Sequence, residues 1–483
     1  MKRLTPTQIR QIYDQGPDAV VDLVTQLFDI IDRLESEVHA LKARGAELER
    51  QVHRNSHNSS QPPSADGLKK PPPKSQRRPS GRLRGGQPGH PGETLEMVDA
   101  PDTVERHPVA LCEECGESLD AVVPNRMIRR QVFDIPPLSL TVTEHQAEVK
   151  ECPTCHHKTT GTFPAEVVAP VQYGPRVLGL STYLQVFQMI PIDRIRQLFF
   201  ELLGQAPSGR TLVDAATRTS ERVKPLLIPI REALRRAPVI HVDETGFRVE
   251  GRLWWMHTAT APGYTLYGLH PRRGQEGIAD LGVMDQRKGV AVHDFWKPYY
   301  RFPERHALCN AHLLRDLTGL YEVTGEPWIA TLQSLLADML AATNQARAAH
   351  QSHVDPARVA SYQAYYDLLV HQGRQRHPDP PASGRRGRVK RDLAQNLLLR
   401  LETRRPEILA FLEDLTIPFD NNAAERALRM MKVKQKVSGA FRTAAGGKTF
   451  ATIRSYVMTA IQQGQAPLTT LWSVLAGEAW IPS

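Results

Sequence analysis

Residues 239–246 read Val-Ile-His-Val-Asp-Glu-Thr-Gly, an apolar, β-rich segment that ends on a carboxylate and then meets a glycine. Such a run predicts a short buried strand that breaks into a turn, so Asp243 is expected at the rim of a sheet. Residues 289–295, Gly-Val-Ala-Val-His-Asp-Phe, repeat this layout and carry Asp294 at the same place. The two stretches therefore predict two carboxylates at neighbouring strand ends.

The third candidate acid, Glu425, lies near the start of a helix-like run. It follows Asn421 and Asn422. We expect Asn422 to cap the helix, so that Glu425 lies in the first turn. Ordinary turn and helix-start residues give the same local patterns. Glu244 is a rival to Asp243, but strand alternation directs it to the opposite face and leaves it out of the predicted site.

Histidines and tryptophans near these acids are expected to pack rather than to bind metal or DNA. His241 and His293 each precede an acid on a predicted strand and are left out of the metal site. Three tryptophans are interpreted as core or hairpin aromatics rather than as base stackers, namely Trp254, Trp255 and Trp296.

Length and charge point to a multidomain chain with a polyanionic partner. A chain of 483 residues exceeds one ordinary domain, and its net charge is +9 with a pI near 9.3. The positive charge is clustered in residues 54–90 and 421–454, which favours DNA binding. The side chains predicted to contact DNA are Lys69, Lys70, Arg77, Arg78, Arg82, Arg84, Arg426, Arg429, Lys432, Lys434 and Lys436.

The N-terminal region, residues 1–53, carries a heptad pattern. The leucines at one core position recur every seven residues, at Leu27, Leu34, Leu41 and Leu48. This pattern predicts a parallel coiled coil, and hence a homodimer or higher oligomer; an amphipathic helix packed on its own domain is the alternative. Residues 54–108 are rich in Pro, Ser, Gly and Arg and are interpreted as a solvated basic linker that can order on DNA.

Four of the five cysteines form two Cys-x-x-Cys pairs, Cys112 with Cys115 and Cys152 with Cys155. Two such pairs offer four thiolates to one tetrahedral ion, so residues 109–160 are interpreted as a structural Zn²⁺ module in a reducing compartment. A redox dithiol and unrelated buried cysteines are the alternatives. Strand-like runs at residues 132–135 and 138–142 predict a small sheet between the pairs.

The rest of the chain alternates helical and strand patterns. Residues 161–238 contain a helix, a glycine turn and a helix, compatible with a helix-turn-helix, although any helical bundle has such corners. Residues 239–317 read as three strands joined by tight turns, a short helix, the second acid's strand and a further helix or short strand. Residues 318–417 are mostly helical, and residues 418–483 contain the third acid's helix and C-terminal helices. This order predicts a multidomain α/β chain with a ribonuclease H-like catalytic domain and a helical insertion.

Several motifs in one order resemble transposases of the insertion sequence 66 type. They are residues 58–64, 86–90, 241–245, 293–294, 309–313 and 420–426, together with the paired Cys-x-x-Cys. The resemblance covers nearly the whole chain and implies a DDE transposase whose catalytic metal ligands are Asp243, Asp294 and Glu425. It also implies DNA, as element ends and target, and small accessory proteins as partners. Asn310 departs from the aromatic residue expected in many relatives.

Phosphodiester chemistry supports the same assignment. Two Mg²⁺ (or Mn²⁺) ions held by carboxylates activate an oxygen nucleophile and stabilise the leaving 3′ oxygen. Water attacks first, and the freed 3′-OH then attacks target DNA. A ribonuclease H-like nuclease or resolvase, and a zinc-containing dimeric DNA-binding regulator without catalysis, are the alternatives. Neither a signal peptide nor a membrane span is apparent, so no membrane partner and a cytoplasmic, nucleoid-associated location in a bacterium are expected.

Overall fold

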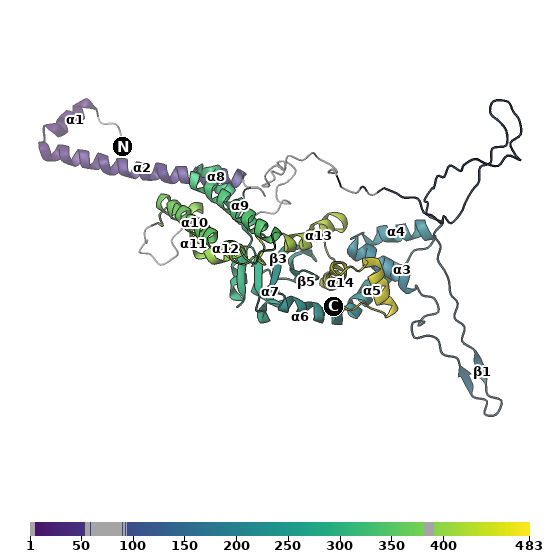
Figure 1. Ribbon diagram of the computed structural model, residues 1–483. Helices are drawn as coiled ribbons and strands as arrows, with labels where there is room; N and C mark the ends of the chain where they lie inside the picture. The colour runs from purple at the N-terminus through teal and green to yellow at the C-terminus, as the bar shows by residue number, and fades with distance from the viewer. Residues whose placement is uncertain (1–4, 54–57, 59–88, 90–91, 93, 381–390) are drawn as a thin grey trace. The chain divides into compact units, whose positions relative to one another are not determined.

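The structure is a computed structural model (Figure 1) that describes residues 5–53, 58, 89, 92, 94–380 and 391–483. Contacts divide the chain into a first unit, residues 1–73, 173–195 and 208–483, and a second unit, residues 74–172 and 196–207. Every helix among the described residues is too short or too polar to cross a membrane. Six of the predicted DNA contacts lie outside the described residues, namely Lys69, Lys70, Arg77, Arg78, Arg82 and Arg84.

The centre of the first unit is a five-stranded mixed sheet with the strand order β5-β4-β3-β6-β7. Its strands are β3 (Val239–Val249), β4 (Arg252–Ala261), β5 (Tyr264–His270), β6 (Val290–His293) and β7 (Arg305–Leu308). Strands β3, β4 and β5 form an antiparallel meander, whereas β6 pairs parallel with β3 and β7 parallel with β6. Helix α7 (Gln275–Asp280) lies between β5 and β6 in sequence. The predicted order of three strands, short helix and strand is confirmed.

One prediction about the first of these strands is wrong, because β3 does not break at Gly246. Gly246 pairs with Trp255 inside the hairpin, where an added Cβ would lie 3.2 Å from Leu253. The chain turns instead at Glu250 and Gly251, whose φ angles of 51° and 74° suit a two-residue hairpin turn. Asp243 therefore lies within β3 rather than at its end.

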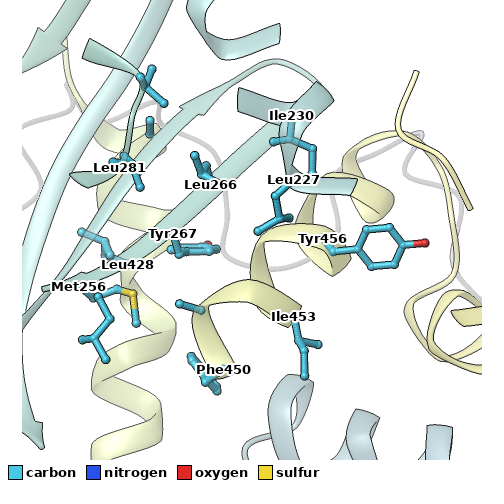
Figure 2. Close-up of a cluster of buried hydrophobic side chains, with 14 of the residues drawn as sticks. Leu227, Ile230, Met256, Leu266, Tyr267, Leu281, Leu428, Phe450, Ile453 and Tyr456 are labelled. Carbon is cyan, nitrogen blue, oxygen red and sulfur yellow. The ribbon is translucent and has the colours of Figure 1, made fainter. Parts of the chain in front are cut away.

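Helices cover both faces of the sheet, because successive residues of a strand point to opposite sides. Ala291 of β6 enters one core, and its neighbours Val290 and Val292 enter the other. The first core (Figure 2) includes side chains of α5 (Gly209–Val223), α6 (Leu227–Arg236), α13 (Asn422–Ser438), α14 (Ala444–Gln462) and α15 (Pro467–Ala476). The second core includes side chains of α8 (Asn310–Thr324), α9 (Pro327–Ala348), α10 (Pro356–Arg376), α11 (Leu393–Thr403) and α12 (Arg405–Glu413).

The helical pattern before the sheet forms α3 (Pro175–Thr182), α4 (Ile192–Leu203) and α5. Ser208 caps α5 by accepting a hydrogen bond from the Thr211 N–H at 3.1 Å. Helix α5 buries one face, which includes Leu212, Ala216 and Val223, and it contacts α14 and α3. The expected helix, turn and helix are present in sequence, and α5 is a core helix of the first unit.

Regular structure is sparse in the second unit. Strands β1 (Val149–Glu151) and β2 (Lys158–Thr160) form an antiparallel pair that brackets the second cysteine pair. The small sheet predicted at residues 132–135 and 138–142 is absent from this described stretch. The two runs are separated by prolines 136 and 137, which have no N–H to donate to a strand partner.

The N-terminal region is helical, with α1 (Pro6–Tyr13) and the long α2 (Pro17–His53). Helix α2 covers the whole predicted heptad region. Its core-position leucines are exposed in this single chain: Leu27, Leu34, Leu41 and Leu48.

Helix α14 protects the edge strand β5. The Ser455 hydroxyl accepts a hydrogen bond from the Tyr267 N–H at 2.8 Å, and the Thr459 hydroxyl accepts one from the Thr265 N–H at 3.1 Å. These buried side chains satisfy donors that a sixth strand would otherwise pair.

We therefore expect Ser455→Ala to lower the free energy of unfolding by about 1–3 kcal/mol, because it leaves the buried Tyr267 N–H without a partner. Urea denaturation measures the change. Ser361→Ala is the matched control, since the Ser361 hydroxyl makes the same bond to the carbonyl four residues earlier but is exposed. Equal stability losses in the two variants would contradict the proposed role of Ser455.

Candidate active site

The pairing of β3 with β6 sets the first two predicted acids at one level. Val239 lies opposite Val290, and His241 lies opposite Val292. Asp243 lies two residues after His241 on β3, and Asp294 lies two residues after Val292 of β6. Because the strands are parallel, both acids lie at the same level of the sheet, Asp294 just after the end of β6 and Asp243 within β3.

Asn421 brings the third acid to this edge. Its side chain is buried; Nδ2 donates to the Val242 carbonyl at 2.8 Å, and Oδ1 lies 2.9 Å from His241 Nδ1. These bonds hold the start of α13 against β3, and Glu425 lies in the first turn of α13. The prediction that Asn422 caps the helix is wrong, because Asn422 is the first residue of α13 and the Asn421 side chain before it makes no capping hydrogen bond.

Burial raises the pKa values of the three carboxyl groups, and repulsion by neighbouring acids raises those of Asp243 and Glu425 further. The pKa of Asp243 is well above its ordinary value because of burial, then because of Glu244, Asp294 and Glu425 nearby. Burial also raises the pKa values of Asp294 and Glu425. Glu425 Oε1 is buried without a hydrogen-bond partner among the described residues. Each of the three acids offers a hard oxygen of the kind that Mg²⁺ prefers, although their oxygens do not form one group within 4.8 Å in the described residues.

Helix α8 contributes side chains that the prediction of the site did not include. His312 Nδ1 and an Arg315 guanidinium nitrogen each lie 3.8 Å from Glu425 Oε1. The Cys309 sulfur, His312 and Glu425 place ligand atoms within 4.8 Å of one another. The Cys-x-x-His spacing across the start of α8 was the available sequence signal.

Glu244 follows Asp243 on β3, so its side chain points to the opposite face of the strand, but it still lies near the candidate active site. Its buried carboxylate accepts from Arg273 Nε at 2.8 Å and from the Tyr299 hydroxyl. Burial and then Asp294 raise the pKa of Glu244 to about 7, against the lowering effects of Arg273 and Tyr299. Sequence patterns did not reveal Arg273 or Tyr299, because both come from segments distant from β3.

The two histidines that precede the acids make bonds to other protein groups. His241 bonds Asn421, and His293 contacts the Asp294 carbonyl and lies 3.0 Å from His306. Burial lowers the pKa values of both His241 and His293. Their contacts agree with the prediction that they pack beside the site.

The positive side chains of α13 divide into exposed and buried groups. Arg426, Arg429 and Lys436 are exposed, whereas Lys432 is half-buried. The prediction that Lys434 contacts DNA is wrong. Its side chain is buried, with Nζ 4.1 Å from the Phe441 ring centroid and 3.1 Å from the Ser438 hydroxyl. Its position on α13 directs the side chain toward the core, so it is not available on the surface to contact DNA.

In the second unit, the two cysteine pairs have matching turns. The Gly116 N–H donates to the Cys112 carbonyl at 3.0 Å, and the His156 N–H donates to the Cys152 carbonyl at 2.9 Å. Both residues that follow the pairs, Gly116 and His156, have positive φ. Backbone N–H groups of Cys115 and Glu114 lower the pKa of Cys112, and those of Cys155 and Thr154 lower that of Cys152. Turns that favour thiolates suit Zn²⁺, although the four sulfurs do not form one group within 4.8 Å in the described residues.

Comparison with known proteins gives the family. Residues 170–449 match the model of the "Transposase IS66 family", and residues 110–156 match a "zinc-finger binding domain of transposase IS66". Residues 7–96 match a family of unknown function. An uncharacterized protein of Sinorhizobium fredii, y4jD, is 24% identical over 381 residues, which cover 71% of this chain and 70% of the relative. The chain belongs to the IS66 family of transposases.

The raised carboxyl pKa values predict how pH and metal act on stability. Without metal, the native chain binds more protons than the unfolded chain between the ordinary and the raised pKa values. The free energy of unfolding should therefore fall as pH rises through this window. Mg²⁺ should restore it, most strongly at higher pH, by about 2.7 kcal/mol at 100 times its Kd.

Thermal unfolding at pH 5 and pH 8, with and without Mg²⁺, measures these changes. Asp243→Asn should reduce both the pH effect and the Mg²⁺ effect. Asp280→Asn, an exposed carboxylate on α7, is the control and should change neither. Full Mg²⁺ stabilisation of the Asp243→Asn variant would show that the ion binds elsewhere.

Proposed function

We propose that this IS66-family chain cuts DNA at the ends of its element and joins the freed 3′-OH to target DNA. The observation that carries the proposal is the register of β3 and β6, which sets Asp243 and Asp294 at one level while α13 supplies Glu425. An antiparallel meander followed by two parallel strands, with acids on the first and fourth, supports a ribonuclease H-like catalytic domain.

In this proposal, Asp243, Asp294 and Glu425 would hold two Mg²⁺ or Mn²⁺ ions, with Asp243 as a ligand to both. Such ions would supply activation of the attacking oxygen and stabilisation of the departing 3′ oxygen. The protein orients the carboxylates: the Glu244 N–H donates to Asp243 at 2.9 Å, and the Trp296 N–H donates to Asp294 at 2.9 Å.

The attacking groups in the proposal are water and then the DNA 3′-OH. The nearby protein nucleophiles are poorly suited to covalent catalysis. Burial raises the pKa of the Cys309 thiol to about 12 and that of Tyr299 well above its ordinary value. Water attack on a phosphodiester gives a 3′-OH end, and attack by that 3′-OH on a target phosphate releases a second 3′-OH, so no oxidant or cofactor is consumed.

The remaining regions have proposed supporting roles. Exposed Arg426, Arg429 and Lys436 follow Glu425 on α13 and would hold the DNA backbone, with Lys432 at their margin. The basic linker would add contacts outside the described residues. We further propose that the four cysteines hold one structural Zn²⁺, that α2 forms a dimeric coiled coil, and that small accessory proteins assist the reaction.

The catalytic proposal predicts that Asp243→Asn, Asp294→Asn and Glu425→Gln each abolish cleavage and strand joining, because a neutral amide is a poor ligand for a hard cation. DNA binding should persist, because the basic side chains are retained. The measurement is an Mg²⁺-dependent cleavage and joining assay beside a gel-shift. Asp280→Asn is the control and should keep full activity. Cleavage without joining by the wild type would favour a nuclease instead.

The coiled-coil proposal predicts that Leu34→Lys lowers the oligomeric state, because a charge would enter the apolar seam. Multi-angle light scattering of the full chain at micromolar concentration measures this. Gln26→Lys on α2 adds the same charge outside the seam and should leave the oligomer intact. An unchanged oligomer in Leu34→Lys would mean that another surface holds the copies together.

A further inference from the structure

A buried ion pair holds one arginine beside the acid cluster. Arg273 lies in the loop between β5 and α7, and its Nε and one terminal nitrogen lie 2.8 and 2.7 Å from Glu244 Oε1. The Glu244 side chain is 1% exposed, whereas that of Arg273 is 38% exposed. The Tyr299 hydroxyl donates to the other carboxylate oxygen of Glu244. The anchor is therefore buried and fully bonded, while the guanidinium reaches the surface.

Two tryptophans restrict the guanidinium further. The Arg273 Cζ atom lies 4.1 Å from the Trp296 ring centroid and 5.0 Å from that of Trp255. Trp296 in turn packs edge-on against Tyr299, with centroids 5.9 Å apart. Side chains from β3, β4 and the segment after β6 thus hold one cation, which removes much of the entropy that a free arginine would lose on binding a ligand.

The cation also lies close to the acids. Asp294 is two residues before Trp296 and accepts its N–H at 2.9 Å. Asp243 immediately precedes Glu244 on β3, although its side chain points to the opposite face of the strand. An exposed, fixed positive charge at the rim of an acidic site is suited to an anionic group that must approach that site.

We propose that Arg273 binds a DNA backbone phosphate next to the metal site; this rests on the proposed function. A guanidinium has five N–H donors in a planar fork, and Glu244 uses those on only two nitrogens, which leaves donors for a phosphate. The two indoles already lie within 5.0 Å of Cζ, which favours phosphate oxygens on the remaining N–H donors over a base stacked on the guanidinium.

Neutralising Glu244 is not a sufficient explanation for this arrangement. An ion pair with one buried partner contributes little net stability, because its attraction must offset the hydration that the Glu244 carboxylate loses. The three acids would also repel a phosphate before the ions shield it. A held arginine offsets that repulsion and fixes the register of the strand, since phosphate contacts position DNA without reading its sequence.

Binding of a labelled duplex oligonucleotide in Ca²⁺, measured by fluorescence anisotropy across a salt series, tests the proposal. Arg273→Gln should weaken binding about tenfold and reduce the slope of log K against log salt by about 0.9, the value for one phosphate contact. Arg272→Gln is the matched control. It removes the same charge one residue away, from an exposed pair with Glu276, and should leave the slope unchanged.

The double variant Glu244→Gln with Arg273→Gln covers the case in which the single variant fails to fold, since two amides replace the ion pair. It should show the same reduced slope. A wild-type slope in a folded Arg273 variant would overturn the proposal and leave Arg273 as a structural partner of Glu244. A wild type that binds DNA but shows no Mg²⁺-dependent cleavage would instead refute the proposed function, because the binding slopes are measured without chemistry.

Discussion

The amide of Asn421 is the interaction on which the arrangement of the acids depends. Strand β3 pairs with β6 only as far as His241, and the next carbonyl, that of Val242, accepts the Asn421 Nδ2 instead. The side-chain amide thus takes the place of a strand partner at the point where β6 ends. This substitution satisfies the backbone, opens the sheet beside Asp243, and brings the first turn of α13 to that opening.

Holding several carboxylates together is costly in the absence of a counterion, and the chain treats its acids in two ways. Glu244 receives a dedicated cation, Arg273, and a phenol donor, Tyr299. Asp243 receives one backbone N–H, and Glu425 Oε1 has no hydrogen-bond partner among the described residues, with Arg315 and His312 each 3.8 Å away. Arg273 balances the charge of Glu244, whereas Asp243 and Glu425 remain available to ligands. This contrast separates a structural carboxylate from those suited to hold metal ions.

Local patterns in the sequence were sufficient for the elements but not for their long-range contacts. Apolar runs ending on Asp243 and Asp294 predicted the two strands, though not their parallel pairing, because burial and alternation act over a few residues. The length of β3 was missed, since Gly246 looks like a turn residue until Trp255 and Leu253 are placed across from it. Lys434 was misplaced because charge alone does not tell which face of a helix is buried. No local pattern links Arg273 to Glu244, which lie on different elements.

The last constraint is the neck of the helical insertion, that is, the place where residues 309–310 and 419–421 at its two ends are bonded to each other. The chain leaves the sheet at Cys309 and returns at residues 419–421 after the helices of the second core. The Asn310 N–H donates to the Phe419 carbonyl at 3.0 Å, and the Asn421 N–H donates to the Cys309 sulfur at 3.2 Å. The Asn310 amide also donates to the Ile408 carbonyl at 3.0 Å, which gives this polar residue a role at the neck.

Because the two ends of the insertion are bonded to each other, the position of Glu425 depends on these few contacts rather than on the length of the insertion. The cost of closing such a loop grows only slowly with its length. The neck therefore allows an acid more than a hundred residues from Asp294 to meet it at one edge of the sheet.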